Sequence, residues 1–156
     1  MQIRPIRAGD NAAVAHLIRD SLAHFGLDVP GTAYFDPQLD DLATFYAQPQ
    51  RGYFVLVNDA DEVVGGCGFG EYCDDTAELQ KLYIAPAAQG QGASRRLVAC
   101  AEAGARVAGY RRIYLETHHV LTVACLLYPK LGYKALSAPL AAGPHTEMDR
   151  FFIKAL

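Results

Sequence analysis

The sequence lacks the features that mark several classes of protein. No apolar run is long enough to cross a bilayer, and the N-terminus has charged residues from Arg4 onward instead of the apolar stretch of a signal peptide. The 14 basic and 17 acidic side chains give a net charge of −3, so the broad positive surface of a nucleic-acid-binding protein is missing. These absences predict a cytoplasmic protein with neither a membrane nor a nucleic acid as its partner.

Paired metal-ligand spacings are also missing. No two of the four cysteines are separated as in a zinc or redox site, and the five histidines have no joint metal spacing, so we expect no metal. The cysteines are expected to be small buried hydrophobes in a reducing compartment. Cys73 is the one alternative, as a nucleophile, but its acidic neighbours disfavour the thiolate that such a role requires.

The length of 156 residues suits one domain spanning residues 1–156. Hydrophobic periodicity and turn residues predict strands at 2–7, 53–57, 63–69, 78–85, 112–117, from 132 onward, and at 148–154. Helices are expected after Asp10, which we expect to act as the N-cap, within 39–46, after Gly92, and around 121–128. Because strands and helices alternate only in the second half, this order predicts an α/β fold with a mixed sheet and helices on both faces.

Glycines are concentrated at two informative places. Those in the strand 63–69 weaken it as a strand and indicate a bulge or a close backbone approach. The second place is the loop Gln89-Gly90-Gln91-Gly92, which lies between a strand that Pro86 stops and the start of a helix. Glycines bring backbone N–H groups close to a ligand, and a helix N-terminus adds unpaired N–H groups, so this loop predicts an anion site suited to a pyrophosphate.

The loop does not fit the two commonest phosphate motifs. The dinucleotide fingerprint requires a third glycine, and Arg95 occupies that position. The Walker pattern, which ends in Gly-Lys-Ser/Thr, is not found either. A nucleotide-binding oxidoreductase is therefore disfavoured.

The loop does resemble the acetyl-CoA loop of the GNAT acetyltransferase superfamily: Gln or Arg, two residues, Gly, one residue, then Gly or Ala. Gln89 and Gly92 match this pattern, and Ser94 departs from it with another small residue. The strand 78–84 is similar to the one before that loop, and residues 126–133, Leu-Leu-Tyr-Pro-Lys-Leu-Gly-Tyr, are similar to the family's Leu-Tyr-Glu-Lys-Leu-Gly-Phe. The resemblance covers nearly the whole chain and is strongest over 78–133. It implies a GNAT-like, mostly antiparallel sheet of about seven strands and an N-acetyltransferase with acetyl-CoA as co-substrate.

The resemblance also implies which residues bind the cofactor. The strand before the loop would offer its backbone to the pantetheine arm, and the loop would hold the pyrophosphate. The residues concerned are Leu82, Tyr83 and Ile84 in the strand, and Gln89, Gly90, Gln91, Gly92, Ala93, Ser94 and Arg95 in the loop. Arg95, Arg96 and Lys130 are candidates for the 3′-phosphate, with solvated surface charge as the alternative for each.

Two residues are expected to be catalytic. Tyr128 matches the family tyrosine near the departing sulfur, where a phenol can donate a proton. Glu78, which begins the central strand, is the first candidate for the base that deprotonates an amine; Glu71, Glu116 and Glu147 are weaker alternatives, and a water chain is another. Relatives often have Asn seven residues before the tyrosine, where this chain has Leu121.

The acceptor is the least defined partner. The segment 25–46 usually shapes the acceptor pocket in similar proteins, and here it carries acidic and aromatic residues that suit a cationic amine or a solvated loop. They are Phe25, Asp28, Tyr34, Phe35, Asp36, Asp40 and Asp41. His145 lies in a loop that often borders this pocket. We expect a small primary amine, such as an amino acid or related metabolite; a protein N-terminus or lysine is the alternative, and an acyl-CoA sensor without turnover is the rival of another class. Many similar proteins form a homodimer.

Overall fold

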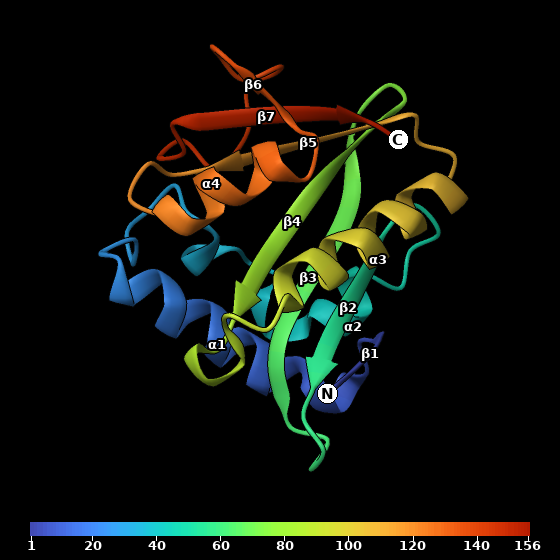
Figure 1. Ribbon diagram of the computed structural model, residues 1–156, viewed down its shortest axis with the longest axis vertical. Coiled ribbons are helices and arrows are strands. Elements are labelled where there is room, and N and C mark those ends of the chain that lie inside the picture. Colours follow the sequence, from blue (N-terminus) through green and yellow to red (C-terminus); the bar gives the residue numbers. More distant parts are fainter.

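The computed structural model, which describes all 156 residues, contains one seven-stranded sheet in the order β1-β2-β3-β4-β5-β7-β6 (Figure 1). Every neighbouring pair of strands is antiparallel except β4 and β5. The strands are β1 Gln2–Pro5, β2 Gly52–Val57, β3 Val63–Cys73, β4 Thr76–Ile84, β5 Arg112–Thr117, β6 Lys134–Leu136 and β7 Arg150–Ala155. The expected mixed and mostly antiparallel sheet is confirmed.

Helices cover both faces of the sheet (Figure 1). The α-helices are α1 Asn11–His24, α2 Leu42–Phe45, α3 Ala93–Val107 and α4 Thr122–Lys130. One core lies under α1 and α2 and includes Val14, Ile18 and Leu42; the other lies under α3 and α4 and includes Leu97 and Ala101. No helix combines the length and the apolar character that crossing a membrane demands.

Several predicted boundaries were wrong. β3 continues to Cys73, four residues past its predicted end, β4 begins two residues early at Thr76, and β6 begins at Lys134. Local hydrogen bonds explain the errors at the first and last strands. The first strand ends at Pro5, because the Arg7 N–H donates to the Asp10 carboxylate instead of the sheet (2.7 Å). The predicted helix within 39–46 is a 3₁₀ turn, Leu39–Asp41, followed by the single turn of α2. The last strand begins at Arg150, because Met148 is still in a turn that its N–H closes on the His145 carbonyl (3.2 Å).

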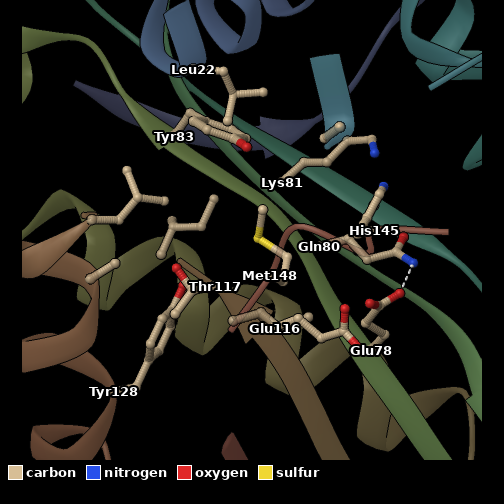
Figure 2. Close-up of a pocket in the computed structure, with 15 residues that line it drawn as sticks. Leu22, Glu78, Gln80, Lys81, Tyr83, Glu116, Thr117, Tyr128, His145 and Met148 are labelled. Carbon is tan, nitrogen blue, oxygen red and sulfur yellow. Dashed lines mark hydrogen bonds between the residues drawn. The ribbon is translucent and has the colours of Figure 1, made fainter. Parts of the chain in front are cut away.

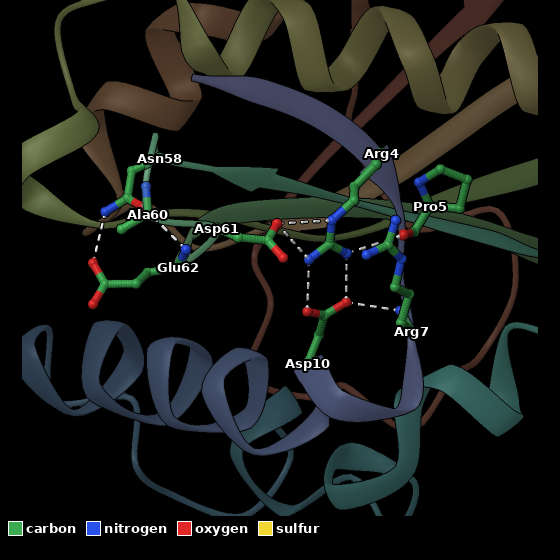
Figure 3. A network of polar contacts seen from close by, with 8 residues as sticks. All are labelled: Arg4, Pro5, Arg7, Asp10, Asn58, Ala60, Asp61 and Glu62. Carbon is green, nitrogen blue, oxygen red and sulfur yellow. Dashed lines mark hydrogen bonds and ion pairs between the residues drawn. The ribbon is translucent and has the colours of Figure 1, made fainter.

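Asp10 precedes α1 as predicted, but its side chain does not cap the helix. It accepts a two-pronged hydrogen bond from Arg4, with Nη1 and Nη2 at 2.7 and 3.0 Å, and Arg4 also reaches Asp61 in the β2–β3 turn (3.2 Å) (Figure 3). The Arg4 guanidinium lowers the pKa of Asp10. This network joins the edge strand, the start of α1 and the β2–β3 turn.

Candidate active site

The site begins where β4 and β5 separate. The two strands pair in parallel only where residues 76–78 of β4 lie beside residues 112–114 of β5. Beyond this point β4 stays paired with β3 and β5 stays paired with β7, so the two strands diverge (Figure 1). The backbone of β4 after Glu78 therefore has no strand partner on that side, which leaves its peptide groups free for a ligand.

A bulge on β4 reshapes the strand within this gap. Gly66 pairs with Tyr83, but Gly68 pairs with Gln80, so β4 has one residue more than β3 between these two pairs. Lys81 lies within this extra length and has a positive φ of 53°. The Tyr53 hydroxyl donates to the Lys81 carbonyl (2.9 Å) and holds the bulge in place. The Tyr53 side chain passes over β3 at Gly66, where no side chain is in its way. A Cβ on Gly66 would lie only 2.4 Å from the Tyr53 hydroxyl. The sequence predicted a close backbone approach or a bulge in the strand 63–69. The structure has a close approach at Gly66, made by the Tyr53 side chain, and a bulge whose extra residue lies on β4, opposite these glycines.

The glycine loop after β4 ends at the N-terminus of α3. Gly90 and Gly92 have φ of 75° and 72°, values that favour glycine, and Gly92 immediately precedes the helix. The helical hydrogen-bond ladder begins with the Arg96 N–H donating to the Gly92 carbonyl (3.2 Å), so the amides of the first turn precede it. The Gln89 side chain donates to the Ile84 carbonyl (3.0 Å) and ties the loop to the end of β4. This arrangement fits a pyrophosphate group.

One pocket lies beside the diverging strands and collects side chains from distant parts of the chain (Figure 2). The residues that line it come from α1, the segment after it, β4, β5, α4 and the loop before β7. They are Leu22, Ala33, Glu78, Leu79, Gln80, Lys81, Leu82, Tyr83, Glu116, Thr117, Leu121, Ala124, Tyr128, His145 and Met148. The structure thus brings Glu78 and Tyr128 together with Leu82 and Tyr83, and it adds two of the weaker candidates, Glu116 and His145.

Other candidates lie elsewhere. Glu71 pairs with Arg51 (2.6 Å), Asp40 pairs with Arg19 (2.7 Å), and neither carboxylate lines the pocket. Glu147 does not line it either. Among the acidic residues between 25 and 46, Asp36 is connected to the pocket indirectly. It contacts Lys81 and His145, and both of these residues line the pocket.

Glu78 is buried at the point where the strands diverge. Its Oε2 accepts a hydrogen bond from Gln80 (2.6 Å), and the Tyr46 hydroxyl fixes the other end of the Gln80 amide (2.8 Å). Burial raises the pKa of Glu78, and the nearby carboxylate of Glu116 raises it further; the Gln80 hydrogen bond opposes this. A carboxylate with a raised pKa accepts a proton more readily at neutral pH, as a general base must.

Tyr128 lies on α4 with its hydroxyl directed into the pocket (Figure 2). Its ring packs against Tyr133 and Phe152, each with a centroid distance of 5.6 Å. Burial raises the pKa of Tyr128, so its hydroxyl stays protonated at neutral pH and is available as a donor. Leu121, at the position of the family Asn, lines the same pocket and offers no hydrogen bond there.

Sequence reasoning missed several residues at this site. Lys81 and Gln80 looked like ordinary strand residues, and only the bulge explains why both line the pocket. Outside the pocket, the structure also brings ligand atoms of His118, His119 and Asp149 within 4.8 Å of one another, which their spacing did not indicate. His119 Nδ1 and Asp149 Oδ2 are hydrogen-bonded there (2.6 Å).

Comparison with known proteins agrees with this geometry. The model of the acetyltransferase (GNAT) family matches residues 16–133. An uncharacterized N-acetyltransferase of Escherichia coli strain K12, YjgM, is 35% identical over 99% of this chain and 94% of its own length.

Two solved structures share the fold. An acetyltransferase of the GNAT family from Staphylococcus aureus Mu50 has a TM-score of 0.89 at 14% identity and covers 99% of this chain and 98% of its own. The structure of yncA from Salmonella typhimurium with its cofactor acetyl-CoA has a TM-score of 0.76 at 20% identity and covers 99% of this chain and 93% of its own. The chain therefore belongs to the GNAT family, and it is an acyltransferase whose co-substrate is acetyl-CoA.

Proposed function

We propose that this protein transfers an acetyl group to the primary amine of a small molecule. The observation that supports this most directly is the single pocket at the divergence of β4 and β5, which holds a buried carboxylate, Glu78, and a protonated phenol, Tyr128. Acetyl transfer to an amine requires a proton acceptor for the amine and a proton donor for the leaving thiolate. Both groups are available in this one pocket.

In the proposed mechanism, acetyl-CoA supplies the thioester that the amine attacks. The backbone of Leu82, Tyr83 and Ile84 and the amides of the loop from Gln89 to Arg95 hold the cofactor. Amines have a pKa near 10, so the acceptor arrives mostly as an ammonium and must lose a proton. Glu78 accepts that proton, directly or through one water molecule, while Gln80 fixes the orientation of its carboxylate. The acetyl group passes from the sulfur to the amine nitrogen, the amine proton remains on Glu78, and the Tyr128 hydroxyl donates a hydrogen bond to the sulfur as the thiolate departs.

The loops over the acceptor side favour a small molecule over a protein substrate. Residues 31–36 and 145–148, here called the roof, are joined by the hydrogen bond from the Glu147 N–H to the Gly31 carbonyl (3.2 Å) and by the contact of His145 with Asp36 (2.7 Å). A chain of amino acids entering from this side would have to separate these segments. A compact amine does not require that change.

The test combines binding and turnover. Acetyl-CoA at about 100 times its Kd should stabilise the protein by about 2.7 kcal/mol, which is a rise of several degrees in Tm. A panel of small amines is then screened for release of free CoA thiol. We expect Glu78→Gln and Tyr128→Phe each to lower kcat by about 10²- to 10⁴-fold while the acetyl-CoA shift in Tm remains.

Glu147→Gln is the matched control, since Glu147 is an exposed carboxylate of the roof that does not line the pocket. It should retain the activity of the wild type. Thiol release with protein N-termini or lysine peptides but with no small amine would reject the proposed acceptor. A Tm shift with no thiol release from any amine would instead favour the acyl-CoA sensor.

A further inference from the structure

Lys81 is a buried cation whose position in the pocket has no evident role in acetyl transfer. Only 4% of its side chain is exposed, yet it lines the pocket together with His145. Asp36, whose side chain is 9% exposed, contacts both: Oδ2 accepts from Lys81 Nζ, and Oδ1 lies 2.7 Å from His145 Nε2. Asp36 itself does not line the pocket. Asp36 therefore links two residues of the pocket wall from outside the pocket.

This placement is imposed by the backbone. Lys81 has a φ of 53° within the β4 bulge, a conformation that a side-chain-bearing residue rarely adopts. The Tyr53 hydroxyl secures its carbonyl, and Asp36 orients its ammonium. An ammonium group has three N–H donors, of which the Asp36 contact uses one. The remaining donors make Lys81 suited to binding an anionic group.

The other polar groups of the pocket have the opposite charge. Glu78 and Glu116 lie together, on the far side of Gln80 from Lys81 and His145 (Figure 2). Each glutamate has one oxygen already engaged, Glu78 by Gln80 (2.6 Å) and Glu116 by the Tyr114 hydroxyl (2.8 Å). Their other oxygens can accept from an ammonium. The pocket thus offers carboxylates at one end and a lysine at the other.

We propose that Lys81, oriented by Asp36 and assisted by His145, binds a carboxylate of the acceptor, so that the acceptor is an amino acid with its reacting amine at the Glu78 end. This inference rests on the proposed function and narrows its substrate class. A purely cationic amine would be attracted by the glutamates but repelled by Lys81. A molecule that carries both charges satisfies both ends of the pocket.

The spacing of the two ends suggests which amino acids to test. Glu78 and Lys81 are three residues apart on one strand, an upper span of roughly 10 Å at about 3.3 Å per residue, which the bulge shortens. A series of unbranched amino acids with one to five methylenes between amine and carboxylate covers this range. For each length, the carboxamide and the decarboxylated amine serve as matched acceptors without the negative charge.

The readout is the ratio of kcat/KM for each amino acid to that for its carboxamide. A charge-assisted hydrogen bond predicts a ratio of about 10 to 100 at the best chain length. The variant Lys81→Met should bring this ratio close to one. Because Lys81→Met leaves Asp36 buried without its lysine, the double variant Lys81→Met/Asp36→Asn, which removes both charges, is measured beside it. Lys134→Met, which removes an exposed lysine of β6, should retain the ratio.

A wild-type ratio near one, with amines still acetylated, would overturn the carboxylate subsite and leave the proposed function standing. A ratio that stays high in both Lys81 variants would show that another group binds the carboxylate. Failure to acetylate any amine, with the acetyl-CoA shift in Tm intact, would instead reject the proposed function, and this inference with it.

Discussion

Gly66→Ala is the sharpest test of how the site is built. An added Cβ would lie 2.4 Å from the Tyr53 hydroxyl and 2.6 and 2.8 Å from two carbons of its ring. Tyr53 is 3% exposed and cannot move aside without disturbing the core. Overpacking of this kind costs about 1–3 kcal/mol, and loss of the hydrogen bond to Lys81 adds about 0.5–1.5 kcal/mol. We therefore expect a loss of about 1.5–4.5 kcal/mol in the free energy of unfolding, or about 3–18 °C in Tm.

The same change should weaken acetyl-CoA binding, because the bulge that Tyr53 holds directly precedes Leu82 and Tyr83. Denaturant unfolding gives the stability, and calorimetric titration gives the Kd. Gly143→Ala is the matched control, since nothing lies within 4 Å of a Cβ at that position. Tyr53→Phe removes the atom in closest contact, so Gly66→Ala should cost less in the Tyr53→Phe background than alone. If Gly66→Ala were as stable as Gly143→Ala and bound acetyl-CoA equally well, this account of the bulge would be refuted.

Gly92→Ala has room for its Cβ but must adopt a φ of 72°, so we expect it to lower the free energy of unfolding by about 1–2 kcal/mol. Calorimetry should also show a clear rise in the Kd for acetyl-CoA. An unchanged Kd would mean that the loop amides do not bind the cofactor. His145 and Lys81 hold the pKa of Asp36 below its usual value despite burial, so this carboxylate stabilises the fold above about pH 4 and loses that contribution as the pH falls further. The stability difference between wild type and Asp36→Asn, measured by urea unfolding, should accordingly shrink from pH 6 to pH 3, and a constant difference would contradict the ion pairs. Tyr46→Phe releases the Gln80 amide and should lower kcat with little change in the acetyl-CoA Kd, whereas an unchanged kcat would mean that Gln80 does not need this anchor.

The sequence was most informative where local signals agree. Alternation of apolar residues predicted β5 with its observed bounds, Arg112–Thr117, and the glycine loop predicted where α3 begins to within one residue. Family-like motifs placed Glu78 and Tyr128 on the right elements. These features depend on short stretches of chain, in which periodicity and turn residues carry the signal.

The features that the sequence did not predict depend on strand pairing and on contacts between residues far apart in the chain. The side chain of Asp10 was expected to cap α1, but Arg4 competes for it, and a capping signal cannot reveal such a partner. The role of Lys81 follows from a register shift between β3 and β4, which requires both strands. Asp36 and His145 meet across 109 residues, so no local pattern could relate them.

The roof has a consequence for how such a protein can change its specificity. The elements expected to bind the cofactor, from β4 to the end of α4, form one uninterrupted stretch of chain, Thr76 to Lys130. Both segments of the roof lie outside this stretch, one before it and one after it, and they are tied to each other mainly at Gly31, Asp36 and their partners. Insertions or exchanges in the roof can therefore alter which amine is accepted while the cofactor-binding half keeps its sequence. Selection for a new acceptor can therefore act on the roof while the glycine loop and α3 stay unchanged.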